Sequence, residues 1–157
     1  ILDSFKETVT NYKNYTQIYH QKLDWLPDDL PFTKDQLIQK LPKLLPQSMY
    51  HGDFTLENIL YTEPSFHLID PVTIEYDSYI FDIAKLRQDL DCKWFLRNEN
   101  IYLDARLQNL SNQLDQTYPG VFNDNILILM LLRVLKHCKK NDSDYLFLMK
   151  EIERLWK

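Results

Sequence analysis

Glycine is nearly absent from this sequence: Gly52 and Gly120 are the only two among 157 residues. A glycine-rich phosphate loop needs several glycines within a short window, because its backbone has to approach the phosphates closely. These residues therefore contain no phosphate-binding loop of the Walker or Rossmann kind, and none of the kind that covers ATP in kinases.

Size and composition predict one folded domain. Apolar residues make up 45% and charged residues 26% of the chain, and a chain of this length buries roughly 70% of its unfolded surface. The longest apolar run, residues 126–132, is too short for a membrane span, and we expect no membrane contact. The chain begins with Ile1 and no signal peptide is recognisable, so we expect a processed or truncated chain.

The two cysteines, Cys92 and Cys138, form no spaced framework. This pattern disfavours a disulfide scaffold or a zinc site and favours a reducing compartment. We therefore expect a cytoplasmic location.

The net charge of −5 is unevenly distributed along the chain. Residues 49–92 carry nine acidic and two basic groups, whereas the flanking segments are neutral or slightly basic. Nucleic-acid binding requires a basic face, and we expect none. A concentrated acidic segment in a folded domain instead favours a cation, either a metal ion or an amine or both.

Apolar residues recur at helical spacing over most of the chain. A first helix is expected over residues 3–26, and Thr33 is a candidate N-cap with Gln36 at the capping-box position of a short second helix. Four more helices are expected over residues 80–90, 103–114, 124–138 and 143–156. The helix that begins at residue 124 is apolar on nearly all sides and is expected to be central and buried.

The middle of the chain has a different pattern. Short strand-like pieces at residues 48–50, 59–61 and 66–69 are separated by polar turns, and residues 62–65 favour a hairpin turn. The expected fold class is α+β, mainly α, with helices around a small β insert.

This insert contains the residues best suited to chemistry. Asp53 and Asn58 flank a four-residue loop, and Asp70 ends the next strand, so a hairpin of this length places Asn58 and Asp70 side by side with Asp53 nearby. Two carboxylates about 4 Å apart repel by roughly 4 kcal/mol at an effective dielectric of about 20. A hard cation such as Mg²⁺, which takes oxygen ligands, offsets that repulsion. Asn58 and Asp70 suit such a metal, which leaves Asp53 to orient a hydroxyl and accept its proton.

Three sequence elements occur in a recognisable order: His-Gly-Asp-x4-Asn at residues 51–58, Ile-Asp at 69–70 and Asp-Ile-Ala at 82–84. With them, residues 44–90 resemble the aminoglycoside phosphotransferase and choline kinase-like group, which has a protein-kinase-like fold. The resemblance implies that residues 1–157 are the C-terminal helical lobe of such a fold, with a β-hairpin insert that carries the catalytic and metal loops.

The resemblance also implies roles for individual residues. Asp53 is implied to be the catalytic base or the residue that orients the hydroxyl, and Asn58 and Asp70 the ligands of a Mg²⁺ ion that bridges to ATP. His51 and Asp82 are implied to support the catalytic loop. ATP and Mg²⁺ are the implied phosphoryl donor and cofactor.

The sequence departs from this family in two places. No segment before residue 50 resembles the first lobe, which supplies a nucleotide-covering loop and a phosphate-pairing lysine. We therefore expect that lobe elsewhere in the full-length protein or on another chain, and exposed apolar surface on the isolated lobe is expected to favour a homodimer. Residues 77–79 are Asp-Ser-Tyr where many members of the family have Gly-Asp-Pro.

Each of these residues also has a structural interpretation. Asp and Asn favour turns, and Asp82 is also a candidate N-cap for the helix that follows it. The acidic residues of the middle segment form either a solvated face or a surface that recognises an amine-bearing substrate. The candidates for substrate contact are Glu57, Asp77 and Asp89.

The sequence predicts an ATP-dependent phosphotransferase lobe that, together with a nucleotide-binding lobe, transfers the γ-phosphoryl group to a hydroxyl. The expected acceptor is a small molecule: a sugar, an amino sugar, an amino alcohol or an aminoglycoside. The alternative is a kinase-like binding or regulatory module without catalysis, favoured by the missing first lobe and disfavoured by the intact Asp53, Asn58 and Asp70. A purely structural helical protein would require the motif spacing to be accidental.

Overall fold

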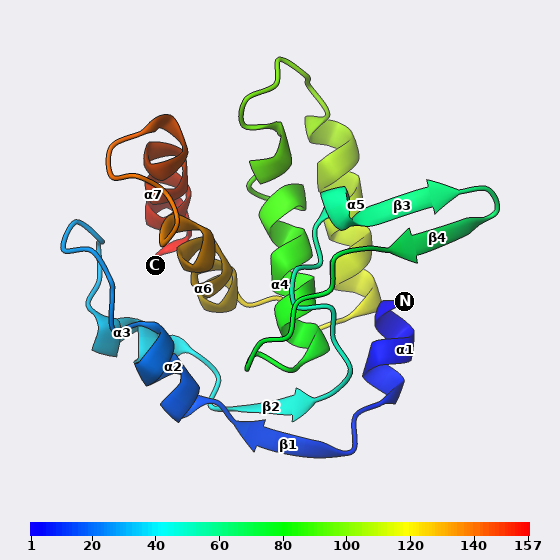
Figure 1. The fold of residues 1–157 in the computed structure, drawn as a ribbon, viewed down its shortest axis with the longest axis horizontal. Helices are drawn as coiled ribbons and strands as arrows, with labels where there is room; N and C mark the ends of the chain where they lie inside the picture. The colour runs from blue at the N-terminus through cyan, green and yellow to red at the C-terminus, as the bar shows by residue number, and fades with distance from the viewer.

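The computed structural model describes residues 1–157 and is mainly α-helical, with two small two-stranded antiparallel sheets (Figure 1). The α+β, mainly α class predicted from the sequence is confirmed. The elements in chain order are α1 (Leu2–Glu7), β1 (Asn11–Asn14), α2 (Thr16–Lys22), α3 (Lys34–Lys40), β2 (Leu44–Gln47), the 3₁₀ turn η1 (Leu56–Asn58), β3 (Ile59–Thr62), β4 (Ser65–Leu68), α4 (Tyr79–Leu90), the 3₁₀ turn η2 (Trp94–Leu96), α5 (Asp104–Thr117), α6 (Asp124–Leu135) and α7 (Ser143–Leu155).

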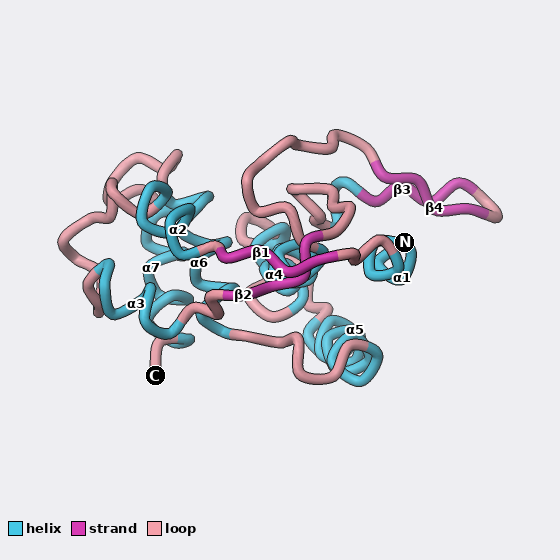
Figure 2. Tube along the Cα trace, turned by 90° about the horizontal axis from the view of Figure 1, so that it is seen from below, coloured by secondary structure: helices cyan, strands magenta, loops and turns pink.

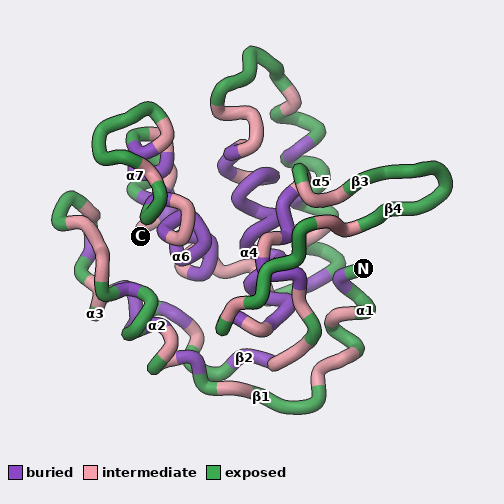
Figure 3. The backbone as a smooth tube through the Cα atoms, in the orientation of Figure 1, coloured by how far each residue is buried: buried purple, intermediate pink, exposed green.

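Four helices form the body of the molecule. In Figure 1, α4 lies between α5 and α6, and α6 lies between α4 and α7, in agreement with the contacts between these helices. A single hydrophobic core of 35 buried residues joins them, and α4 and α6 are buried over most of their length (Figure 3). The central, buried helix expected from residue 124 is therefore confirmed. None of the helices is both long and apolar enough to cross a membrane.

The prediction of a single helix over residues 3–26 is wrong. The chain instead forms α1, then β1, then α2, and β1 pairs with the distant β2, with Asn11 opposite Gln47. Helix α1 is followed directly by Thr8-Val9-Thr10. All three side chains are β-branched and lose χ1 freedom in a helix, which disfavours continuation of α1. Helical spacing could not reveal this pairing, because it joins segments more than thirty residues apart. The strand expected at residues 48–50 is also absent, and β2 ends just before it.

Local signals predicted the short α3 and the β3–β4 hairpin correctly. The Thr33 hydroxyl accepts a hydrogen bond from the Gln36 backbone, and the Gln36 side chain accepts one from the Thr33 backbone, so the capping box is confirmed. Strands β3 and β4 pair in antiparallel register, with Ile59 opposite Leu68 and residues 62–65 at the turn. The hairpin extends away from the helices in both views (Figures 1 and 2), and its base adjoins the Asp53 loop.

Candidate active site

The loop that contains Asp53 is anchored to α4 by the buried carboxylate of Asp82. This carboxylate accepts hydrogen bonds from the backbone N–H groups of His51 (2.6 Å) and Gly52 (2.9 Å). Burial raises the pKa of Asp82 to about 6, although the two N–H donors act in the opposite direction. The N-cap of α4 is Ser78, so the Asp82 carboxylate serves the loop and not the helix end.

His51 connects the Asp53 loop to the end of the hairpin. The backbone N–H of Asp53 donates to Nδ1 of His51 (3.3 Å), so Nε2 carries the proton and donates it to the carbonyl oxygen of Ile69 (2.7 Å). The buried ring also packs edge-on against Phe54, with ring centroids 5.9 Å apart. The neutral imidazole therefore fixes the residue before Asp70 relative to the backbone of Asp53.

Gly52 brings the chain after β4 directly against this loop. Its φ of +84° lies in the left-handed region, and a Cβ atom at this position would stand 2.1 Å from the carbonyl oxygen of Val72. The Val72 N–H donates to the carbonyl oxygen of His51 (2.9 Å). Only glycine fits both the backbone conformation and the close approach.

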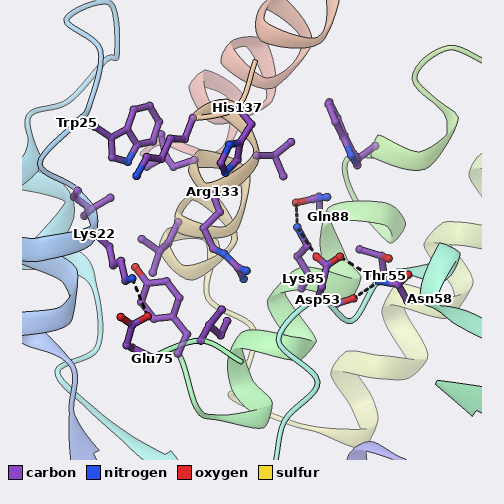
Figure 4. A pocket seen from close by; sticks show the side chains of 18 of the residues that line it. Lys22, Trp25, Asp53, Thr55, Asn58, Glu75, Lys85, Gln88, Arg133 and His137 are labelled. Atoms are coloured by element: carbon purple, nitrogen blue, oxygen red, sulfur yellow. Dashed lines mark hydrogen bonds and ion pairs between the residues drawn. The ribbon is translucent and has the colours of Figure 1, made fainter. Parts of the chain in front are cut away.

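Both carboxylate oxygens of Asp53 are held by neighbouring side chains (Figure 4). Nδ2 of Asn58 donates to the Asp53 carbonyl oxygen (2.8 Å) and to its Oδ2 (3.1 Å). Nζ of Lys85, from α4, lies 3.1 Å from Oδ1. The Asp53 side chain is 36% exposed and that of Lys85 only 7%, so the carboxylate is fixed from behind and open in front.

Asp70 lies next to this pair through the backbone. The N–H of the preceding residue, Ile69, donates to the carbonyl oxygen of Asn58 (3.1 Å). Asp70 has a φ of 53°, a left-handed conformation in which Asp is enriched. The residue is exposed, and its carboxylate makes no hydrogen bond or ion pair within the chain. The structure thus brings Asp53 and Asn58 into direct contact. Asp70 follows Ile69, whose backbone is hydrogen-bonded to both His51 and Asn58.

Asn58 and Asp70 keep oxygen atoms free for a hard cation. Because the Asn58 amide faces Asp53 with its nitrogen, its Oδ1 is not engaged by Asp53. Amide and carboxylate oxygens suit Mg²⁺, which commonly completes its shell with water and substrate phosphates. No group of three or more His, Cys, Asp or Glu side chains gathers in the chain. A magnesium ion held by these two residues would therefore take its other ligands from water and phosphate.

A cavity of about 430 Å³ opens in front of Asp53 and is lined by the Asp53 loop, α4, the second half of α6 and the end of α2. Trp25, Tyr76 and Trp94 contribute aromatic side chains to its wall. Lys22 and Glu75 also line it and neutralise each other at 2.8 Å (Figure 4). The hydroxyl of Tyr76 is buried without a hydrogen-bond partner. The cavity therefore offers aromatic surfaces to a small ligand.

Sequence reasoning missed two basic residues at this site, Lys85 and Arg133. Both guanidinium NH groups of Arg133 donate to the carbonyl oxygen of Gly52 (3.1 Å each), and no carboxylate pairs with this arginine. Both residues line the cavity. A charged residue within an otherwise apolar helical run is the signal that could have found Arg133, because such a residue needs a specific partner when it is partly buried.

The three acidic residues expected to contact substrate lie in different environments. Glu57 lines the cavity. Asp77 lies outside the cavity and is held by Lys13 (2.7 Å) and the Tyr15 hydroxyl (3.0 Å). Asp89 is buried, and its carboxylate accepts a hydrogen bond from the backbone N–H of Leu56, at the far end of the Asp53 loop (2.8 Å). Of the three, only Glu57 lines the cavity, and its contact with substrate stays a prediction.

Asp53 thus faces an open cavity, with Asn58 in direct contact with it and Asp70 beside them along the chain. Residues 5–119 match the model of a family described as the phosphotransferase enzyme family, APH. The match covers most of the chain, including the Asp53 loop, the β3–β4 hairpin and α4, and the chain belongs to this family. The predicted relation to aminoglycoside phosphotransferases is therefore confirmed. No significant match was found among curated proteins or solved structures.

Proposed function

We propose that this chain is the catalytic lobe of an ATP-dependent small-molecule phosphotransferase, with Asp53 as the base. The observation that carries the proposal is the Asp53 carboxylate, fixed at one oxygen by Asn58 and at the other by Lys85 and open toward a cavity of small-molecule size. A nucleotide-binding lobe, on the same protein or on another chain, completes the enzyme.

In the proposed reaction, the acceptor hydroxyl lies in the cavity against Asp53. As its oxygen bonds to the γ-phosphorus of ATP, its proton passes to the Asp53 carboxylate. The bond from that phosphorus to the β–γ bridging oxygen breaks, and ADP leaves. Such transfers depend mainly on positioning and on neutralisation of charge. Mg²⁺ held by Asn58 and Asp70 neutralises phosphate charge when it is bound.

The cavity supports a small acceptor. Cavities that enclose small ligands commonly measure about 300–1,000 Å³, with apolar walls and a few polar groups, and this one is of that kind. Sugars, amino sugars, amino alcohols and aminoglycosides present hydroxyls of suitable size. Glu57 offers a carboxylate to an amine on such a molecule.

Replacement of Asp53 by Asn tests the proposal. Asn58 and Lys85 retain an oxygen to contact, whereas the proton acceptor is lost, so turnover is expected to fall on the order of 10²–10⁴-fold. The measurement is phosphoryl transfer from MgATP to a panel of these acceptor classes by the full-length protein. Asp115→Asn, which removes a carboxylate from the exposed side of α5, is the matched control. Turnover close to that of the unmodified protein in Asp53→Asn would rule out the assigned base.

A further inference from the structure

Two basic side chains, Lys85 and Arg133, line the cavity beside Asp53 and have N–H groups without a hydrogen-bond partner. Lys85 comes from α4 and Arg133 from α6, and these two helices pack against each other. Three other basic residues line the cavity: Lys22 is paired with Glu75, and Lys136 and His137 are exposed to solvent. Lys85 and Arg133 are the two basic residues of the lining that are buried or half-buried, and both contact the loop of the proposed base.

Lys85 has one hydrogen-bond donor more than its partners use. Its ammonium group contacts Asp53 Oδ1 (3.1 Å) and donates to Oε1 of Gln88 (3.3 Å). An ammonium has three N–H donors, so the third is free while the side chain lines the cavity. Burial lowers the pKa of Lys85, and the attraction of Asp53 only partly opposes that effect. A further anion would stabilise this charge.

The positive charge of Arg133 has no carboxylate partner. Its guanidinium donates to two neutral acceptors, the carbonyl oxygen of Gly52 (two N–H groups, 3.1 Å each) and Sδ of Met130 (3.5 Å), and pairs with no carboxylate. Burial lowers the pKa of Arg133, while the nearby charge of Asp53 opposes the shift. A guanidinium has five N–H donors, so others remain for a bound oxyanion.

We propose that Lys85 and Arg133 form an oxyanion subsite in front of Asp53 that binds a phosphate-type group. The third N–H of Lys85 and the free N–H groups of Arg133 donate to its oxygens. This inference rests on the proposed function and deepens it, because it assigns the counter-charge for phosphate at a lobe without a glycine-rich loop. The oxyanion is either the phosphoryl group in transfer or a phosphate carried by the acceptor.

Inorganic phosphate is the first probe. In a titration followed by ¹H–¹⁵N NMR, we expect saturable shifts of the Gly52 and Asp53 backbone signals and of the Arg133 Nε–H. Shifts elsewhere, or shifts that do not saturate, overturn the proposal even without any variant.

Variants of Lys85 provide the second test. Lys85→Gln is expected to weaken phosphate binding on the order of tenfold or more, because charge-assisted hydrogen bonds are the strong ones. Lys85→Arg is expected to retain most of the affinity. Lys93→Gln removes the same charge outside the cavity, where Lys93 pairs with Asp104, and should bind as the unmodified protein does. Equal affinity of Lys85→Gln and the unmodified protein overturns the subsite.

Competition then separates the two sources of the oxyanion. Displacement of phosphate by a non-hydrolysable MgATP analogue, but not by MgADP, assigns the subsite to the donor's terminal phosphate. Displacement by glycerol 3-phosphate without that nucleotide difference assigns it to a phosphorylated acceptor. Displacement by neither means that the site takes inorganic phosphate alone, which contradicts the proposal.

These measurements need no turnover, so the outcome is independent of the Asp53 test. If Asp53→Asn stays active while Lys85→Gln loses phosphate, the proposed base is wrong and the subsite stands. If Asp53→Asn is inactive and phosphate binding is unchanged in Lys85→Gln, the base stands and the subsite is wrong.

Discussion

Asp82 and Asp89, both on α4, are buried, although aspartate is mostly exposed in folded proteins. Asp82 holds the start of the Asp53 loop at His51 and Gly52, and Asp89 holds its end at Leu56. Burial is the main cause that raises the pKa of each carboxyl to about 6. Both ends of the loop are thus fixed by groups whose ionisation in the folded state is costly.

This burial predicts a pH dependence of stability. A carboxyl whose pKa in the folded state lies above its unfolded value of 3.8 contributes stability that is fully present below about pH 4 and is lost as pH rises through 6. Asp89→Asn cannot titrate, so between pH 4 and pH 7 it is expected to gain about 2–3 kcal/mol relative to the unmodified protein. Urea unfolding at both pH values measures the difference.

Asp115→Asn serves as the control in this comparison, because Asp115 is exposed on α5. Its stability should follow that of the unmodified protein over the same pH range. A constant difference in unfolding free energy between Asp89→Asn and the unmodified protein would contradict the expected burial effect.

At the level of single residues, the sequence revealed the acidic and amide groups of the site but not its cations. Asp53, Asn58 and Asp70 lie close together in one continuous stretch, where spacing along a loop and hairpin limits where they go. Lys85 and Arg133 reach the same point from two helices, and Arg133 lies eighty residues beyond Asp53. Their meeting depends on how α4 packs against α6, which no local pattern encodes.

At the level of elements, a comparison of Gly52 with Gly120 distinguishes the cost of backbone strain from the cost of a steric clash. Gly52 and Gly120 both have positive φ, but only Gly52 has an atom, the Val72 carbonyl oxygen, in the place of a Cβ. Gly120→Ala is expected to cost about 1 kcal/mol of unfolding free energy, from the left-handed conformation alone. Gly52→Ala is expected to cost several times more, because the segment after β4 has to move at Val72. Urea unfolding of the two variants measures both costs, and equal costs would show that the contact at Val72 is unimportant.

Elements with local signals were predicted well from the sequence. The capping box of α3, the turn of the β3–β4 hairpin and the apolar stripes of α4 to α7 are all short-range features. The β1–β2 sheet was missed, because its strands pair across more than thirty residues. Helical spacing of apolar residues in the first 26 positions concealed this pairing.

At the level of the whole molecule, one continuous core predicts that α6 supports all parts of the structure. Leu131 is 0% exposed within that core, whereas Leu146 on α7 is 56% exposed. Leu131→Ala is expected to lower the unfolding free energy by about 2–5 kcal/mol, and Leu146→Ala by far less. Urea unfolding, followed by both circular dichroism and tryptophan fluorescence, measures these losses. Non-coincident transitions in Leu131→Ala would contradict a single cooperative core.

The imidazole of His51 links the end of the β3–β4 ribbon to the backbone of the proposed base, since it bonds to Ile69 on one side and to Asp53 on the other. A tilt of this projecting ribbon would be carried through one rigid ring to the backbone of Asp53. A group bound at Asp70 would consequently stay aligned with the proposed base when the ribbon tilts. The ring is thus a direct structural link between the end of the ribbon and the Asp53 loop.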